Sequence, residues 1–161
     1  MSNQVIFSII FLSFTIQATY SSTGSLCQED NRILSKRKRI GRLIRPNVDE
    51  TGCTAFLIGK SCMLSAGHCR KKLGLVEFNV PLSTNQGDIR HSIAKNQYTV
   101  VRKSMRYDHG SGLDYMVFRT LPNRISKKYA GEVEGFYDLN LSKPKIGEIV
   151  EIIGYGYNHA R

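Results

Sequence analysis

Residues 52–69 of this 161-residue chain have the sequence GCTAFLIGKSCMLSAGHC. Two short apolar segments, Thr54–Ile58 and Met63–Ser65, lie on either side of Gly59-Lys60-Ser61, which suits the turn of a β-hairpin. The second segment is followed by two small residues and then His68. Because small residues allow close backbone packing, we expect His68 to lie at a strand end that faces a cleft.

Other short apolar segments, separated by turn residues, extend this β pattern along the chain. In Val76–Val80 the apolar side chains alternate with Glu77 and Asn79, which we expect to face solvent. Further strands are predicted at Arg39–Ile44, Tyr98–Arg102, Tyr115–Thr120 and Ile146–Ile153, with polar surface loops at Leu82–Asn96 and Arg106–Gly112. Strands spaced in this way predict an all-β barrel or sandwich.

The first 24 residues contain no charged side chain, and Val5–Ile16 within them is mostly apolar. This run is shorter than the roughly 20 residues that span a bilayer, and small residues follow it. The pattern predicts a secretory signal peptide cleaved within residues 18–24, with a buried N-terminal strand as the alternative. The remaining residues suffice for one domain, and no other stretch is apolar enough for a membrane span.

The chain is basic, with a formal charge of +10. This charge favours acidic partners such as an anionic polysaccharide, whereas no nucleic-acid-binding motif or aromatic groove is present, so we expect no nucleic-acid partner.

A processing protease could cut the run Lys36-Arg37-Lys38-Arg39 after Arg39 and free Ile40. We favour the simpler interpretation, a solvated basic approach to the first strand. If the cut occurs, we expect no activation of the trypsin type.

Four cysteines in a secreted chain predict disulfides, and four allow three connectivities. A bridge between Cys53 and Cys69, sixteen positions apart, would hold the turn that carries His68 and contribute roughly 3 kcal/mol. Cys27 and Cys62 would then pair with each other or remain free, and the sequence leaves both alternatives open.

Three segments resemble the chymotrypsin-like serine proteases. The cysteine-to-histidine region, residues 52–69, is similar to the histidine region of that family, and most similar to its glutamyl-endopeptidase-like and bacterial secreted branch. GLDYMVF at residues 112–118 resembles the family's aspartate strand, and GEIVEIIGYG at residues 147–156 resembles the strand that opens its second barrel. The resemblance covers roughly residues 40–157.

The resemblance implies a secreted serine endopeptidase with a chymotrypsin-like double β-barrel, of which this chain holds the first barrel and the start of the second. Residues 1–24 would be the signal peptide, 25–39 a short basic leader, and 40–161 a peptidase domain truncated before its serine motif. His68 would act as general base and Asp114 as the carboxylate that orients it, with Asp108 as a rival carboxylate in a polar loop. The substrates would be proteins or peptides. We expect no cofactor, and no metal because His91, His109 and His159 lack ligand spacing.

The nucleophile that this chemistry needs is missing from the sequence. No Gly-x-Ser-Gly-Gly segment occurs, and Gly110-Ser111-Gly112 precedes Asp114 rather than following it. We therefore expect a fragment, or a chain that is inactive as given. The alternatives are a non-catalytic, protease-like binding module for anionic partners and a structural domain in which the histidine motif is coincidental. Asn140 begins a glycosylation sequon on a predicted loop.

Overall fold

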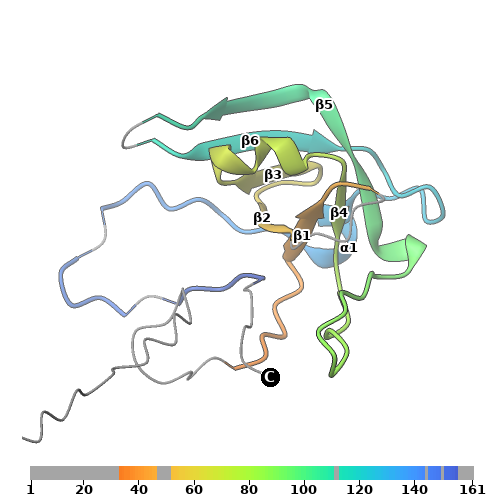
Figure 1. Ribbon diagram of the computed structural model, residues 1–161. Helices are drawn as coiled ribbons and strands as arrows, with labels where there is room; N and C mark the ends of the chain where they lie inside the picture. The colour runs from red at the N-terminus through yellow and green to blue at the C-terminus, as the bar shows by residue number, and fades with distance from the viewer. Residues whose placement is uncertain (1–32, 47–51, 111–112, 144, 150, 156–161) are drawn as a thin grey trace, which may run out of the picture. The chain divides into compact units, whose positions relative to one another are not determined.

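Six antiparallel strands form a closed β-barrel in the computed structural model (Figure 1). In chain order they are β1 (Ile40–Ile44), β2 (Cys53–Leu57), β3 (Cys62–Ser65), β4 (Leu75–Glu77), β5 (Gln97–Asp108) and β6 (Tyr115–Thr120). Around the barrel the order is β1-β2-β3-β6-β5-β4. The structure describes residues 33–46, 52–110, 113–143, 145–149 and 151–155, all within the unit Asn31–Arg161.

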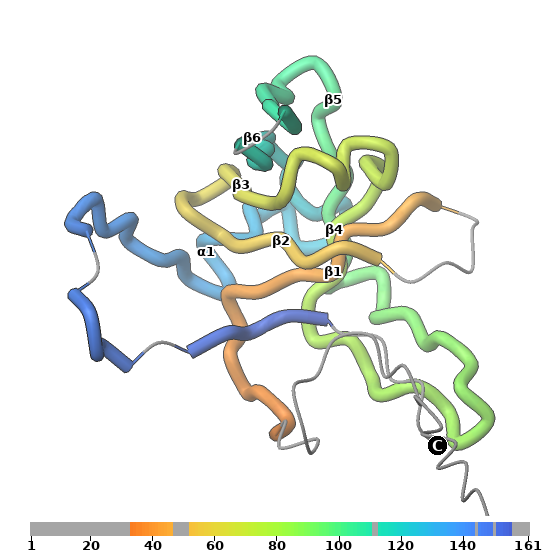
Figure 2. Tube along the Cα trace, turned by 60° about the vertical axis from the view of Figure 1, so that its left-hand side comes forward, coloured from red at the N-terminus to blue at the C-terminus, as the bar shows by residue number. Residues whose placement is uncertain are grey.

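Buried and exposed side chains alternate along the strands, and the buried ones form the barrel core. In β6, Met116 and Phe118 are fully buried, whereas Tyr115 and Arg119 are exposed. The largest fully buried apolar side chains come from every strand and the adjoining segments: Leu43, Leu57, Met63, Leu73, Val76, Phe78, Tyr98, Met116 and Phe118. Figure 2 shows β1, β2 and β3 as neighbours, in agreement with their antiparallel pairing. The prediction of an all-β fold is confirmed.

Strand β5 is much longer than predicted, because the segment expected to form a loop after it belongs to the same strand. Arg106–Asp108 pair with β6, and the register shifts between Val101 and Arg106. A bulge of this kind bends a strand and increases its twist, which helps a sheet to close. The predicted loop Arg106–Gly112 is therefore wrong for its first three residues. The strand prediction Tyr98–Arg102 found only the first half of β5.

Strand β4 ends earlier than predicted, and Glu77 is buried rather than exposed. Asn79 adopts a left-handed conformation with φ of 50°, so the extended run does not reach Val80. Glu77 lies opposite Arg42 on β1 and opposite Gln97 on β5. Its carboxylate bonds to both side chains and to His91, so that polar groups enclose the outer face of this strand.

The predicted strand Ile146–Ile153 is not formed in its described residues, 146–149 and 151–153. Ile146, Ile149 and Ile152 are almost fully exposed, and no described strand pairs with this segment. A strand needs a neighbour for its backbone hydrogen bonds, which an apolar sequence pattern does not itself provide. The start of a second barrel is therefore not present as a strand in the described residues.

Strand β1 (Ile40–Ile44) confirms the predicted strand Arg39–Ile44 except for its first residue. Ile40 is buried and pairs with Phe56, and the carbonyl of Arg39 accepts a hydrogen bond from the backbone N–H of Leu57. The run Lys36–Arg39 is exposed, and cleavage after it remains a prediction. The predicted signal peptide and Cys27 lie outside the described residues.

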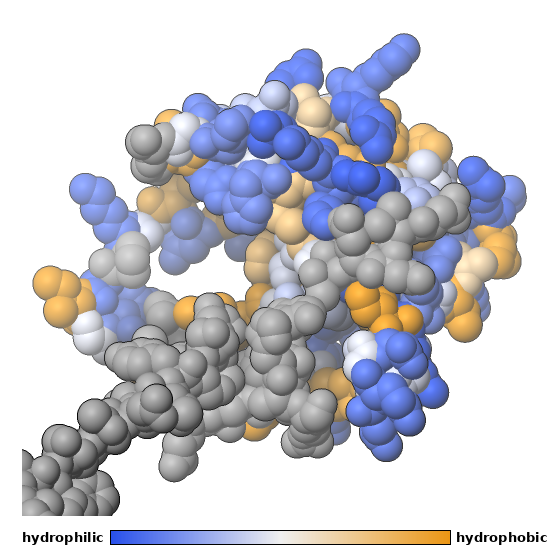
Figure 3. All heavy atoms as spheres, viewed as in Figure 1, coloured by the Kyte–Doolittle hydropathy of each residue, from blue (hydrophilic) through white to orange (hydrophobic). Residues whose placement is uncertain are grey.

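Among the described residues, three short helices accompany the barrel: η1 (Gly67–Lys72) and η2 (Ala94–Asn96), both 3₁₀-helices, and α1 (Ala130–Glu134). None of the helices in the described ranges has the length and apolar character that crossing a membrane requires. The predicted loop Leu82–Asn96 has no strand, and only its last three residues are helical. In Figure 3, seen from the same side as Figure 1, hydrophilic side chains gather over η1 and β5.

Candidate functional site

Helix η1 carries His68 directly after β3, and its position depends on Gly67. A β-carbon at Gly67 would clash with the carbonyl oxygen of Asp108 and lie 2.9 Å from the carbonyl oxygen of Tyr115. The start of η1 therefore packs against the backbone where β5 ends and β6 begins, and only glycine fits there. This contact brings His68 beside Asp114, the residue that precedes β6.

A disulfide fixes the other side of the same helix. Cys53 at the start of β2 is joined to Cys69 in η1, with a Cα–Cα distance of 6.1 Å and a sequence separation of 16. The pair that the sequence singled out is thus bonded, and His68 lies between two constraints, the disulfide and the close backbone contact at Gly67. Cys62 has no disulfide partner among the described residues, and Cys27 lies outside them.

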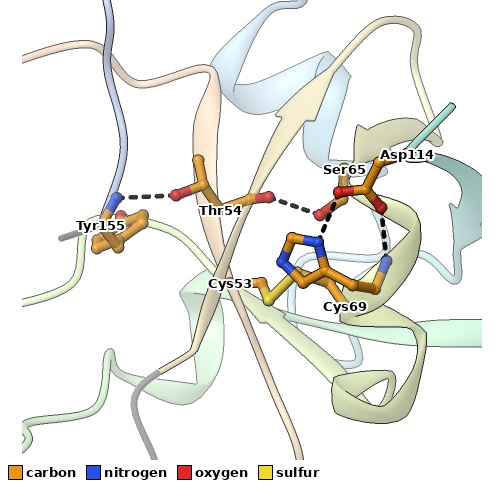
Figure 4. Close-up of a disulfide and its surroundings, with 7 residues drawn as sticks. Cys53, Thr54, Ser65, Cys69, Asp114 and Tyr155 are labelled. Carbon is orange, nitrogen blue, oxygen red and sulfur yellow. Dashed lines mark hydrogen bonds and ion pairs between the residues drawn. A yellow bond between two sulfur atoms is a disulfide. The ribbon is translucent and has the colours of Figure 1, made fainter. Parts of the chain in front are cut away.

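The carboxylate of Asp114 holds His68 at two points (Figure 4). Oδ1 accepts a hydrogen bond of 2.8 Å from the backbone N–H of His68, and Oδ2 lies 2.6 Å from Nδ1 of its ring. A carboxylate can only accept hydrogen bonds, so the proton of the neutral ring is assigned to Nδ1. The lone pair is then on Nε2, the ring nitrogen that can accept a further proton.

These hydrogen bonds also set the charge of Asp114. Donation from the backbone N–H of His68, and secondly from its ring, lowers the pKa of Asp114 below the ordinary value of 3.8. Asp114 is therefore ionised at neutral pH. The side chains of His68 and Asp114 are 68% and 46% exposed, so the ring remains accessible to another molecule.

The rival carboxylate, Asp108, is engaged elsewhere. Its Oδ1 accepts a hydrogen bond of 2.9 Å from the backbone N–H of Gly110, which stabilises the turn after β5. His109 stacks on Tyr107, with ring centroids 5.9 Å apart. The structure thus brings Asp114, and not Asp108, to His68.

Ser65 lies near this pair but is held by the barrel. Its buried hydroxyl donates a hydrogen bond of 2.7 Å to the carbonyl oxygen of Thr54. The hydroxyl oxygen of Thr54 in turn accepts a hydrogen bond of 2.9 Å from the backbone N–H of Tyr155 (Figure 4). Ser65 therefore supports the strand pair β2–β3 rather than serving as a nucleophile. Ser111 lies outside the described residues.

One group of side chains has the proximity of a metal site. The ligand atoms of Cys53, His68 and Cys69 lie within 4.8 Å of one another. Metal binding by cysteine requires thiolates, and both sulfurs are used in the disulfide. In this oxidised form the only metal ligand that the group offers is the imidazole of His68.

The predicted sequon lies on the surface. Asn140 is exposed, and its Oδ1 accepts a hydrogen bond of 2.9 Å from the backbone N–H of Ser142. Its exposure allows modification, which stays a prediction.

Two sets of charged residues were missed by sequence reasoning. The first is the buried pair of Arg42 and Glu77, of which the alternation in Val76–Val80 placed Glu77 on the solvent side. The second is Arg70-Lys71-Lys72, the basic last turn of η1, which was visible in the sequence as three consecutive cations directly after Cys69.

Comparison with known proteins adds no assignment: no protein-family model matches this chain, and no curated protein matches it at a significant level.

Proposed function

We propose that this chain supplies the histidine and aspartate of a chymotrypsin-like serine endopeptidase. The supporting observation is that Asp114 accepts hydrogen bonds from both the backbone N–H and the ring Nδ1 of His68. This leaves Nε2 of the ring as the proton acceptor. The closed six-stranded barrel and the Cys53–Cys69 disulfide beside the histidine agree with the sequence resemblance to that family.

In this proposal His68 is the general base. A serine hydroxyl is a weak nucleophile at neutral pH until its proton is removed as the peptide carbonyl is attacked. Nε2 of His68 would take that proton and later deliver it to the leaving amine, since an imidazole exchanges protons near neutral pH. The formation of imidazolium brings a positive charge next to Asp114, whose ionised carboxylate stabilises it.

The serine and its oxyanion hole must come from outside these 161 residues. The Gly-x-Ser-Gly-Gly segment typical of the family does not occur in the sequence, and Ser65 is buried and bonded to Thr54. The chain by itself therefore has no expected peptidase activity. The 68% exposure of the His68 side chain leaves room for a serine and a substrate at Nε2.

The direct test is fluorophosphonate labelling of the natural protein, captured with an antibody against this chain. We expect a labelled serine in the captured polypeptide, located by mass spectrometry, and no label after heat denaturation. Captured protein that is folded but takes no label, in conditions that label a known serine protease, would contradict the proposal. The result would instead favour the alternative function, a non-catalytic, protease-like binding module for anionic partners.

A further inference from the structure

Three side chains that can bind a metal ion lie together where the disulfide joins β2 to helix η1. The ligand atoms of Cys53, His68 and Cys69 are within 4.8 Å of one another. A tetrahedral zinc ion, with bonds of about 2.3 Å to sulfur and about 2.0–2.1 Å to nitrogen, holds its ligand atoms roughly 3.5–3.8 Å apart. Once the sulfur–sulfur bond is broken, small side-chain movements are enough to reach that spacing.

Asp114 already holds His68 in the form that a metal-binding histidine takes. Its Oδ2 lies 2.6 Å from Nδ1 of the ring, so the proton is assigned to Nδ1 and the lone pair to Nε2. A histidine that binds a metal through one ring nitrogen almost always donates the other N–H to a carboxylate, a carbonyl or water. The hydrogen bond from the backbone N–H of His68 to Oδ1 fixes the carboxylate as well.

We propose that the reduced chain binds Zn²⁺ through Cys53, His68 and Cys69, with Asp114 as the residue that orients the histidine. A dithiol reductant gives two electrons and two protons to the disulfide and becomes a cyclic disulfide itself. The sulfur–sulfur bond of the chain breaks and leaves two cysteine thiols. Both thiols release their protons when they coordinate the ion, which forms two Zn–S bonds and one Zn–N bond.

The donor atoms and their burial select the ion and its coordination. Two thiolates and an imidazole suit Zn²⁺, whereas Mg²⁺ and Ca²⁺ take oxygen ligands. Cys69 is 4% exposed, so its sulfur ties the ion to the barrel. The side chain of His68 is 68% exposed, which leaves the fourth position of the ion open to water.

Zinc and the disulfide exclude each other, because both use the same two sulfur atoms. Every chain passes through the reduced state, since cysteines are synthesised as thiols. Bound zinc also occupies Nε2 of His68, the nitrogen that would accept a proton in the proposed peptidase. Zinc binding needs neither a serine nor a peptide substrate, so it stands or falls independently of the proposed enzyme.

The test uses the full chain with Cys27→Ser/Cys62→Ser, in which Cys53 and Cys69 are the only cysteines left. The protein is reduced with a phosphine, which adds no competing thiol, and is titrated with Co²⁺ as a spectroscopic probe and then with Zn²⁺. We expect one equivalent of Co²⁺ to produce the thiolate charge-transfer band and the visible bands of a tetrahedral site, and Zn²⁺ to abolish them. The oxidised protein should show neither set of bands.

Two aspartate variants measure whether the site has the geometry of the folded chain. Asp114→Asn should lower the zinc affinity about 10–100-fold, as expected when a carboxylate that orients a metal ligand is lost. Asp108→Asn is the matched control and should leave the affinity unchanged. An unfolded chain can also bind zinc through its thiols, but the two aspartates are then equivalent. Equal affinities of the two variants would therefore overturn the proposal.

The nitrogen ligand and the folded state are tested separately. His68→Gln should weaken zinc binding more than Asp114→Asn does, whereas the control His109→Gln should not weaken it. An unchanged affinity in His68→Gln would overturn the proposal. If reduction unfolds the chain, zinc should restore the circular-dichroism spectrum of the oxidised protein, because the free energy of metal binding then drives folding. A reduced chain that stays unfolded in excess zinc would also contradict the proposal.

Discussion

Two histidine–carboxylate pairs in the described part of the chain differ in what else the carboxylate bonds. Asp114 accepts hydrogen bonds from the backbone N–H and from the ring of His68, and both side chains are substantially exposed. Glu77 is fully buried and is shared by Arg42, Gln97 and His91, at 2.7, 3.1 and 3.0 Å. The first arrangement orients one ring, whereas the second joins β4 to three other segments of the chain.

This difference separates a chemical role from a structural role for the same pair of residue types. A buried carboxylate shared among several donors holds those donors together, and removal of one partner of a buried ion pair leaves an uncompensated charge in the interior. An exposed carboxylate that serves a single histidine can stabilise a transient proton on that ring. The pair at His68 is therefore suited to proton transfer and the pair at His91 to anchoring the segment that precedes β5.

The largest expected effect is that of Asp114→Asn on the labelling rate of the natural protein. An amide at this position would donate to Nδ1 and force the ring proton onto Nε2, so the base would have its lone pair on the wrong nitrogen. We expect the rate of fluorophosphonate labelling to fall by about 10⁴-fold. Asp108→Asn is the matched control and should label at the normal rate. Similar rates for both variants would remove the distinction between the two carboxylates.

Glu77→Gln should destabilise the fold by about 3–5 kcal/mol, because it leaves the Arg42 guanidinium buried without a counter-charge. Glu151→Gln, which breaks the exposed pair with Arg37 at 2.9 Å, is the control and should cost less than about 1 kcal/mol. Urea unfolding of the 161-residue chain measures both. A Glu77→Gln protein as stable as its control would show that burial does not distinguish the two pairs.

Replacement of the disulfide by serines, Cys53→Ser/Cys69→Ser, should lower the free energy of unfolding by about 3 kcal/mol, as expected for a closed loop of this length. It should also broaden the NMR signals of His68, since η1 would lose one of its two constraints. Cys62→Ser is the control, because Cys62 forms no disulfide with a described residue. Unchanged stability and sharp His68 signals in the double variant would contradict this role.

The smallest expected effect is on pH dependence. The folded-state pKa of Asp114 is lowered by the hydrogen bonds from His68, so its stabilising contribution is complete above the unfolded pKa of about 3.9. That contribution is lost as the pH falls through the lower, folded value. A ¹³C NMR titration of the Asp114 carboxyl should give a midpoint below 3.8. A midpoint at or above this value would mean that the hydrogen bonds to His68 do not form in solution.

Much of the barrel was predictable, because local alternation matches burial in its strands. β6 was predicted with the same bounds, and Met116, Phe118 and Thr120 are buried in it, whereas Tyr115, Val117 and Arg119 are not. The burial of Glu77 was not predictable in this way, because its side chain is covered by Arg42, His91 and Gln97, which come from three distant segments. The bulge in β5 likewise depends on pairing with β6 and leaves no periodic signal.

The candidate site was predicted by resemblance rather than by residue pattern. His68 and Asp114 are 46 positions apart, and the antiparallel pairing of β3 with β6 brings them together. The requirement for glycine at position 67 also comes from tertiary structure, through the backbone of Asp108 and Tyr115. The cations of η1 were visible in the sequence, but the approach of Arg45 and Arg102 to them was not.

The tautomer of His68 tests the central claim most directly. Long-range ¹H–¹⁵N NMR of the 161-residue chain, at a pH where the ring is neutral, distinguishes a protonated ring nitrogen from one with a lone pair. The account predicts a proton on Nδ1 and a lone pair on Nε2, and the reverse in Asp114→Asn. A proton on Nε2 in the natural sequence would contradict it, because His68 could then not accept a proton at the nitrogen that faces away from Asp114.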